Sequence, residues 1–318
     1  GPLMIITQKV TSLAFSIHDG VTKKKEDLTK NQSKYAISKI PSTLEYFSYM
    51  LHFQVLMAGP VLFYNDYIDF IHGRHVVLEP SPCAVVIKKV TTSLICALVY
   101  LFFIPMFPIT VVKEDDFVER TSLAYKFFYL LICTMLVRFK YYYAWLFADA
   151  ICNNSGLGFD GFDENGTAKW DLISNVDIRK FECSSSLKES IEAWNIGTNR
   201  WLRMVVYDRV SSHGTILTYA LSALWHGFYP GYYITFANGA IFTVASRSIR
   251  RTIRNYFTGN EKSMSFYHFL TGLTTRLVMP YITFTFVVLE WWPSIRLYYH
   301  MYMCLHIMAL LAIFVVPK

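Results

Sequence analysis

Long apolar blocks alternate with shorter polar stretches along the whole chain. A helix needs about 20 apolar residues to cross a bilayer, and several blocks reach or exceed that length. We predict apolar helical segments over Ala84–Val112, Leu123–Ile151, Thr215–Ala245, Phe266–Leu289 and Leu297–Val316. The pattern therefore indicates a helical membrane protein.

Two blocks carry breaks in their pattern. Leu44–Phe63 contains Glu45, His52 and a Gly59–Pro60 pair, which predicts a broken or re-entrant helix. Thr215–Ala245 is too long for one simple span, and its Pro230–Gly231 pair predicts a break within it. We expect the glycines on either side of Pro230, Gly227 and Gly231, to allow close helix approach.

The polar stretches between the blocks predict loops. After the amphipathic residues 1–17, which suit the tail of a helix, Asp19–Pro41 is rich in lysine and is predicted to be a soluble loop. Tyr64–Pro82 and Lys113–Arg120 are also polar, and Cys152–Arg203 is the longest polar stretch of the chain.

The composition strengthens the membrane interpretation. Hydrophobic residues make up 53% of the chain and charged residues only 17%, with a mean hydropathy of +0.31, whereas about a quarter of a soluble domain is charged. The surplus of apolar surface must face lipid. Because a membrane barrel would show short alternating segments instead, we predict an all-α, polytopic transmembrane protein.

Charge and motifs exclude several other classes. The formal charge of +7 is more typical of membrane topology and anionic lipid than of nucleic-acid binding. The six cysteines form no CxxC pair, and His72 and His75 lack a third ligand, so we expect neither a disulfide framework nor a metal site. Walker and GxSxG motifs are also absent from the sequence.

Two polar residues in apolar, aromatic surroundings are candidates for chemistry. His226 lies in the run WHGFYPGYY, and Asn195 lies in EAWNIGTNRWLR. Polar groups at membrane depth are costly and are therefore often functional. A neutral histidine can accept a proton from an alcohol, and an asparagine amide can stabilise an oxyanion. The alternatives are a structural buried histidine and a helix-cap or turn asparagine.

Basic and aromatic residues form a second group of candidates. Four arginines recur at three- and four-residue spacing, which places them on one helix face, where they can meet either anionic lipid or substrate phosphates. Tyrosines cluster at Tyr141–Tyr143 and around Tyr229, where they suit packing, the membrane interface or the wall of a lipid path. The arginines are Arg247, Arg250, Arg251 and Arg254.

Four segments of the chain resemble one family, the membrane-bound O-acyltransferases. WHGFYPGYY at Trp225–Tyr233 is similar to the family's histidine motif, and EAWNIGTNRWLR at Glu192–Arg203 to its asparagine motif. AGPVLFYNDYIDF at Ala58–Phe70 and KYYYAWLFADAICNNSGLGFDGFDENG at Lys140–Gly166 resemble motifs of the lysophospholipid acyltransferase branch, closest to the members that act on lysophosphatidylethanolamine and lysophosphatidylserine. Family members usually begin with more helices, so we expect residues 1–318 to be one acyltransferase domain that lacks N-terminal helices of the family.

The resemblance implies an activity and roles for particular residues. Acyl-CoA would donate an acyl chain to the free hydroxyl of a lysophospholipid in the endoplasmic reticulum membrane, inside a chamber of broken or re-entrant helices, without a metal or another cofactor. His226 would be the general base, and Asn195 would position a reactant or polarise the carbonyl. The residues implied to contact substrate are Trp194, Trp225, Tyr229, Tyr232, Tyr233, Lys140, Arg247, Arg250, Arg251 and Arg254.

Three alternatives stay open at this point. The acceptor could be a sterol, diacylglycerol or protein serine within the same family. The chain could instead be a lipid transporter or scramblase in which His226 relays protons. It could also be a catalytically inactive fragment that binds lipid or a partner.

Overall fold

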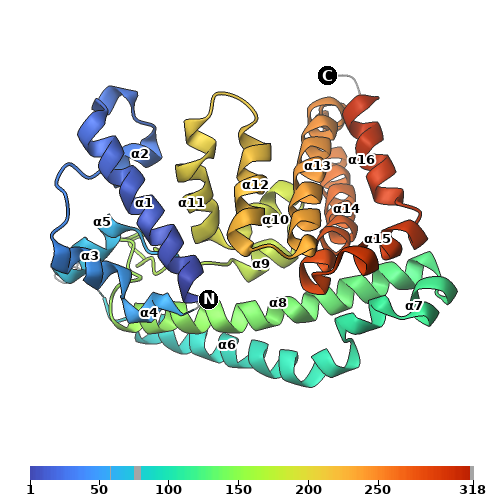
Figure 1. Cartoon of the computed structure of the whole chain (residues 1–318), viewed down its shortest axis with the longest axis horizontal. Helices are drawn as coiled ribbons and strands as arrows, with labels where there is room; N and C mark the ends of the chain where they lie inside the picture. The colour runs from blue at the N-terminus through green and yellow to red at the C-terminus, as the bar shows by residue number, and fades with distance from the viewer. Residues whose placement is uncertain (58, 75–79, 316–318) are drawn as a thin grey trace. The chain divides into compact units, whose positions relative to one another are not determined.

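All the regular elements in the described part of the chain are helices. The computed structural model describes residues 1–57, 59–74 and 80–315 (Figure 1), and within them only two isolated β-bridges occur, Phe162 with Ala168 and Val176 with Trp194. The all-α prediction is therefore confirmed. The chain forms two compact units, which are described separately: unit 1 comprises residues 1–97, 140–177 and 194–214, and unit 2 comprises the remainder.

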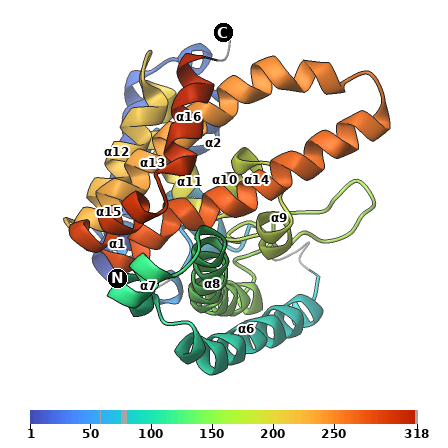
Figure 2. The ribbon, with the colours of Figure 1, turned by 90° about the vertical axis from the view of Figure 1, so that its right-hand side faces the viewer.

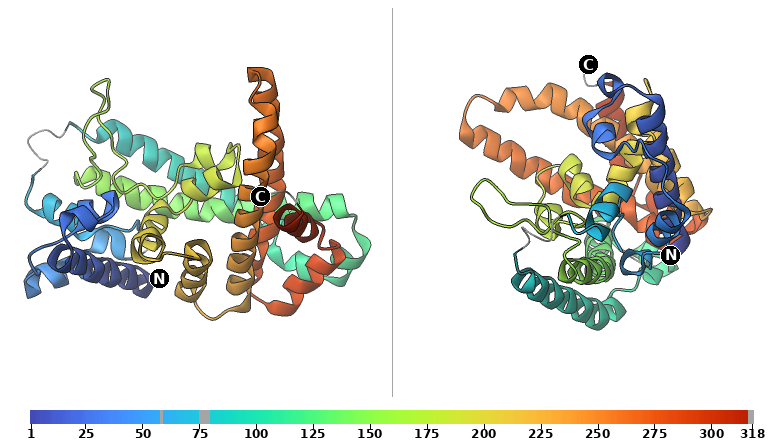
Figure 3. Two further views of the ribbon diagram at one scale, coloured as in Figure 1. Left: turned by 90° about the horizontal axis from the view of Figure 1, so that it is seen from above. Right: turned by 90° about the vertical axis from the view of Figure 1, so that its left-hand side faces the viewer.

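Most elements of unit 1 are short helices. Its elements are α1 (Pro2–Thr22), η1 (Lys25–Asp27), α2 (Lys30–Tyr35), α3 (Thr43–Met50), α4 (Phe53–Leu56), α5 (Tyr64–Ile71), α11 (Ile196–Val205), η4 (Tyr207–Arg209) and parts of α6 (Cys83–Phe103) and α8 (Leu123–Asn154). Helices α1 and α2 lie side by side (Figure 3). Helix α1 also packs along α11, where the Trp201 indole donates to Thr11 Oγ1 over 2.8 Å.

Unit 2 contains the long helices of the C-terminal half. Besides the other parts of α6 and α8, its elements are η2 (Ile104–Met106), η3 (Ile109–Lys113), α7 (Asp115–Arg120), α9 (Ile178–Glu182), α10 (Leu187–Ala193), α12 (Gly214–His226), α13 (Pro230–Ile253), η5 (Arg254–Phe257), α14 (Glu261–Val288), α15 (Trp291–His300) and α16 (Cys304–Phe314). Helix α13 runs out to η5, and α14 returns from it (Figure 2). Helix α13 packs against both α14 and α16.

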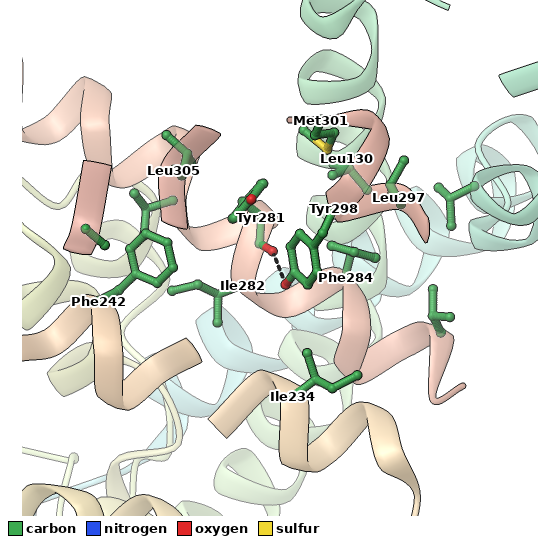
Figure 4. Close-up of a cluster of buried hydrophobic side chains, with 14 of the residues drawn as sticks. Leu130, Ile234, Phe242, Tyr281, Ile282, Phe284, Leu297, Tyr298, Met301 and Leu305 are labelled. Atoms are coloured by element: carbon green, nitrogen blue, oxygen red, sulfur yellow. Dashed lines mark hydrogen bonds between the residues drawn. The ribbon is translucent and has the colours of Figure 1, made fainter. Parts of the chain in front are cut away.

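The core of unit 2 combines apolar packing with a chain of hydrogen-bonded polar groups, of which Asn238, Tyr281 and Tyr298 are buried and His306 is half-buried. His306 contacts the Tyr281 hydroxyl through Nδ1 over 2.8 Å and Asn238 Oδ1 through Nε2 over 3.0 Å. The Asn238 amide donates to the Tyr298 hydroxyl, and this hydroxyl donates to the carbonyl of Tyr281 (Figure 4). Four helices, α13 to α16, are thus joined by hydrogen bonds inside an apolar cluster.

The predicted breaks in two apolar blocks are confirmed. Helix α12 ends at His226 and α13 begins at Pro230, the position where proline suits a helix start. Residues 44–63 likewise form two short helices, α3 and α4, rather than one. Gly227 has a φ of 116° and open space beside it, so its role is conformational, and the expected close helix approach at Gly227 is wrong.

Three other expectations are corrected by the structure. Lys113–Arg120, predicted to be a short loop, contains the helix α7. The single apolar helix predicted over Leu297–Val316 is broken, because Tyr302 and Met303 adopt left-handed conformations and α16 leaves α15 at an angle of 80°. Val316 itself lies outside the described residues. The predicted loop Asp19–Pro41 is partly helical: α1 continues to Thr22, and Thr29 and Gln32 form a capping box that starts α2.

One helical segment among the described residues is long and apolar enough to cross a membrane. It is Cys83–Lys113, with 31 residues, and the bent pair α15 and α16 meets the same criterion only when taken together. The other long apolar helices carry charges within their length, such as Lys126 and Arg138 in α8 and Arg276 in α14.

Helices α13 and α14 approach each other closely at Gly231. The Gly231 N–H donates to the carbonyl of Leu289 over 2.8 Å, and the hydroxyls of Thr235 and Thr285 lie 2.6 Å apart one turn further along. A Cβ atom on Gly231 would lie 2.2 Å from the Thr285 carbonyl oxygen. The expectation that Gly231 allows close helix approach is therefore confirmed.

We predict that Gly231→Ala destabilises the protein, because backbone atoms of α14 must shift to admit the methyl group. The free energy of unfolding should fall by roughly 1–3 kcal/mol, as in other overpacked sites, measured by denaturant unfolding in detergent micelles. Gly259→Ala is the matched control, since nothing lies within 4 Å of the added Cβ. Equal stabilities of the two variants would contradict the close approach.

Candidate functional site

Asn195 occupies a strained position at the start of α11. It is the N-cap residue of this helix, with a left-handed φ of 48° and ψ of 52°. Among non-glycine residues, asparagine and aspartate tolerate this conformation best. The structure therefore confirms the helix-cap position that was considered for Asn195, and leaves its side-chain amide available for a second role.

The Asn195 amide is held by Asn175, a residue that precedes it by 20 positions. Asn175 Nδ2 donates to Asn195 Oδ1 over 3.0 Å. Asn175 also accepts two backbone hydrogen bonds from the first turn of α11, one from Ile196 to its carbonyl and one from Gly197 to its Oδ1. The orientation of the Asn195 side chain is thus tied to the backbone of its own helix.

Aromatic side chains from α8 surround Trp194, the residue before Asn195. The rings of Tyr141, Tyr142 and Trp145 lie 5.7, 5.9 and 4.9 Å from the Trp194 ring, all near edge-to-face. Such contacts stabilise beyond the area that they bury. Two of the quoted motifs, separated by about fifty residues in the chain, therefore meet in unit 1. Lys140 is exposed, with its Nζ 5.1 Å from the Tyr141 ring centroid.

A third motif segment also reaches α11. Val61, from the quoted segment Ala58–Phe70, is buried against Gly197, and a Cβ atom on this glycine would lie 3.1 Å from the Val61 side chain. The small residue lets the two backbones approach. Ala58 lies outside the described residues.

His226 lies at the C-terminal end of α12 among aromatic rings of unit 2. Its ring centroid is 4.6 Å from Trp225, 5.4 Å from Tyr232, 5.1 Å from Phe236 and 4.9 Å from Phe286. Phe236 stacks on the imidazole, whereas Phe286 and Trp225 present their edges. Two of these rings come from α13 and one from α14, so the surroundings of His226 depend on how these helices pack.

Tyr219 fastens the helix of His226 to α13. Its ring fills a notch at Gly239, where an added Cβ would lie 2.7 Å from the ring, and its hydroxyl bonds Thr243 over 2.8 Å. At the other end of α12, the Arg247 guanidinium donates to Thr215 over 2.7 Å. Helix α12 is therefore held to α13 at two points along its length.

The remaining substrate-binding candidates of unit 2 are distributed over the two ends of α13. Tyr229 and Tyr233 lie at its start, with 59% and 39% of their surface exposed, beside the half-buried Tyr232. The arginines lie at its other end: Arg247, Arg250 and Arg251 are exposed on α13, and Arg254 begins η5. Arg254 therefore lies outside α13, and the shared face of all four arginines stays a prediction.

The two catalytic candidates belong to different units, Asn195 to unit 1 and His226 to unit 2. Three motif segments come together around Asn195, and the histidine motif is assembled separately with rings of α13 and α14. Sequence reasoning missed Asn175, Phe236 and Phe286. Asn175 lies inside the polar stretch Cys152–Arg203 but in none of the quoted motifs. A phenylalanine in an apolar block gives no signal that separates a ring near His226 from any other.

Burial raises the pKa of one carboxyl group of unit 1, that of Asp66. Asp66, in the segment Ala58–Phe70, is half-buried on α5, and burial raises the pKa of its carboxyl from 3.8 to about 6, although the charges of Lys34 and Arg200 act in the opposite direction. Arg200 belongs to α11, so this carboxyl lies within the electrostatic surroundings of the asparagine motif.

The chain belongs to the membrane-bound O-acyltransferase family. The model of this family, described as "MBOAT, membrane-bound O-acyltransferase family", matches residues 1–289. Over its full length the chain is 54% identical to "Lysophospholipid acyltransferase 6" of Drosophila melanogaster and 43% identical to "Membrane-bound glycerophospholipid O-acyltransferase 1" of Homo sapiens. It is also 30% identical, over 98% of its length, to "Lysophospholipid acyltransferase" of Schizosaccharomyces pombe.

The relatives are longer than this chain. It spans 46% of the Drosophila protein, 67% of the human protein and 65% of the Schizosaccharomyces protein. The resemblance seen in the four motifs is confirmed at the level of the family.

We predict that Asp66→Asn stabilises the protein at neutral pH. Because the folded-state pKa lies above the unfolded value, the native state loses stability as the pH rises from about 4 to about 6, and the amide avoids this loss. A shift from 3.8 to about 6 corresponds to about 3 kcal/mol in the free energy of unfolding.

Denaturant unfolding at pH 7.5 and at pH 4 tests this prediction. The stabilising effect of Asp66→Asn should be present at pH 7.5 and nearly absent at pH 4. The control is Asp27→Asn, at an exposed carboxyl outside the motifs, which should change little at either pH. If Asp66→Asn changes the free energy of unfolding by the same amount at both pH values, the buried Asp66 carboxylate does not destabilise the protein.

Proposed function

We propose that the chain is the catalytic part of an acyltransferase that moves an acyl chain from acyl-CoA to the free hydroxyl of a lysophospholipid. The proposal is supported by an imidazole that aromatic rings enclose in unit 2 and, described separately, by an asparagine amide that its neighbour orients in unit 1, in a chain of the O-acyltransferase family. The names of the relatives support the lysophospholipid as acceptor.

The reaction requires one proton acceptor and one stabilised oxyanion. His226 takes the proton from the lysophospholipid hydroxyl as its oxygen attacks the thioester carbonyl. The resulting oxyanion accepts a hydrogen bond from the Asn195 amide. When the carbonyl reforms, the carbon–sulfur bond breaks, and the His226 proton passes to the thiolate of coenzyme A. A thioester is already activated, so we expect no metal and no other cofactor.

The aromatic and basic candidates take supporting roles in this proposal. Trp225, Tyr229, Tyr232 and Tyr233 line the path of an acyl chain beside His226, and Trp194 does the same beside Asn195. The exposed residues Arg247, Arg250, Arg251 and Lys140, with the half-buried Arg254, meet phosphates of coenzyme A or of the lysophospholipid, which suits their charge.

The same proposal covers the membrane arrangement. We infer a multi-pass protein of the endoplasmic reticulum membrane in which residues 1–318 act as one domain around a chamber of broken helices. Large apolar side chains exposed along the long helices support lipid contact. They include Leu94, Leu98 and Phe102 on α6, Phe269 and Leu273 on α14, and Leu311 and Phe314 on α16.

We predict that His226→Ala abolishes acyl transfer, because the alcohol then lacks its base. Release of free thiol from acyl-CoA, measured in nanodiscs with a panel of lysophospholipids, should fall by about 10²–10⁴-fold. His268→Ala, at an exposed histidine of α14, is the control. Thiol release that survives in His226→Ala would remove His226 as the base.

We predict a comparable loss for Asn195→Gly, which keeps the left-handed backbone without strain but removes the amide. Turnover should fall by about 10²–10³-fold, the usual effect of deleting an oxyanion donor. The melting temperature should fall by only a few degrees, because Asn175 Nδ2 loses one acceptor. Unchanged turnover would leave Asn195 as a helix cap only.

The same assay separates the competing functions. If sterol, diacylglycerol or a serine peptide, and not a lysophospholipid, accepts the acyl chain, the chain has the activity of another branch of the family. Lipid movement between leaflets without thiol release would favour a transporter or scramblase. Lipid binding without either activity would favour an inactive fragment.

A further inference from the structure

We propose that Asn175 is a positioning residue that fixes which end of the Asn195 amide faces the reactants. This inference rests on the proposed function, in which Asn195 donates a hydrogen bond to the developing oxyanion. Both residues belong to unit 1, and their side chains are joined by the 3.0 Å hydrogen bond from Asn175 Nδ2 to Asn195 Oδ1.

A backbone N–H sets the direction of this pair. The Gly197 N–H can only donate, and it meets Asn175 Oδ1 at 3.0 Å, so the Asn175 amide must present its oxygen to α11 and its nitrogen to Asn195. Asn195 must then present its oxygen to Asn175. The NH2 group of Asn195 is thereby turned away from Asn175, as a donor for another acceptor.

Asn175 itself is rigidly held. Its side chain is only 4% exposed, and the preceding residue, Ser174, donates to Asp149 over 2.6 Å. The Lys89 ammonium bonds Asp149, Ser174 and the carbonyl of Trp170 over 2.7, 3.2 and 2.8 Å. This ion pair between α6 and α8 pins the loop from Trp170 to Asn175, and a side chain oriented by such supporting contacts is pre-organised for catalysis.

The substitution Asn175→Asp changes the orientation of the Asn195 amide while it keeps the shape of the side chain at position 175 nearly unchanged. The carboxylate has nearly the same shape and still accepts from Gly197, and a negative charge is favourable at the start of a helix. It has no N–H to offer to Asn195. The Asn195 amide then turns its NH2 group toward the carboxylate and its oxygen toward the reactants, where it repels an oxyanion.

The test compares Asn175→Asp with Asn175→Ala and with Asn165→Asp in the thiol-release assay. Asn165 is exposed in the same polar stretch, so its substitution controls for the added charge. For Asn175→Asp we expect kcat to fall by about 10²-fold, as for loss of an oxyanion donor. The KM for acyl-CoA should stay nearly unchanged. The melting temperature should fall, because a carboxylate at a position that is only 4% exposed loses its hydration, but it should stay above that of Asn175→Ala, which loses both side-chain hydrogen bonds.

The possible outcomes distinguish a failure of the positioning role of Asn175 from a failure of the proposed function. Native turnover in Asn175→Asp, with turnover lost in Asn195→Gly, overturns the positioning role and leaves the proposed function intact. If Asn175→Asp loses activity and also melts at a temperature as low as that of Asn175→Ala, the role of Asn175 is structural only, and the positioning role is overturned as well. A native chain without thiol release overturns the proposed function, and the positioning role with it.

Discussion

The structure depends on one constraint, that each polar group buried in a predominantly apolar chain needs a partner within the chain. Apolar surroundings offer no water, and an unpaired buried polar group costs a few kcal/mol. Compact local networks supply partners for most of these groups, whereas four buried side-chain atoms among the described residues have none. These atoms are Gln8 Oε1, His52 Nε2, Asp149 Oδ1 and Asn153 Oδ1. Lys89 and Asp149 share Ser174 in unit 1, while His306, Asn238 and Tyr298 form a continuous chain in unit 2. These networks fix how the helices pack.

His226 differs from His306 in how it is surrounded. Both ring nitrogens of His306 have hydrogen-bond partners, and the imidazole joins α16 to α13 and α14. Among the described residues, the neighbours of His226 are aromatic rings, which pack against the imidazole without fixing its proton on either nitrogen. The first arrangement is structural. The second suits a proposed base, because a ring held by packing alone can accept a proton from a substrate and pass it on.

The sequence predicted the helical class and most apolar segments because these follow from long blocks and from proline. It failed where the backbone changes direction without such a signal, as at Tyr302 and Met303, whose left-handed conformations break the last predicted helix. It also failed to predict Asn175, because the contact with Asn195 joins positions 20 residues apart through a loop with no periodic pattern. The separate surroundings of Asn195 and His226 depend on tertiary packing, which residue spacing does not determine.

The position of Asn195 explains why a single residue type meets two demands there. The backbone demands a left-handed conformation, which favours glycine, asparagine or aspartate. The Asn175 side chain demands an acceptor, which excludes glycine. The proposed reaction demands a donor directed at an oxyanion, which excludes an ionised aspartate. Only asparagine supplies the conformation, the acceptor and the donor together, so the strained helix cap and the proposed catalytic amide are two consequences of the same side chain.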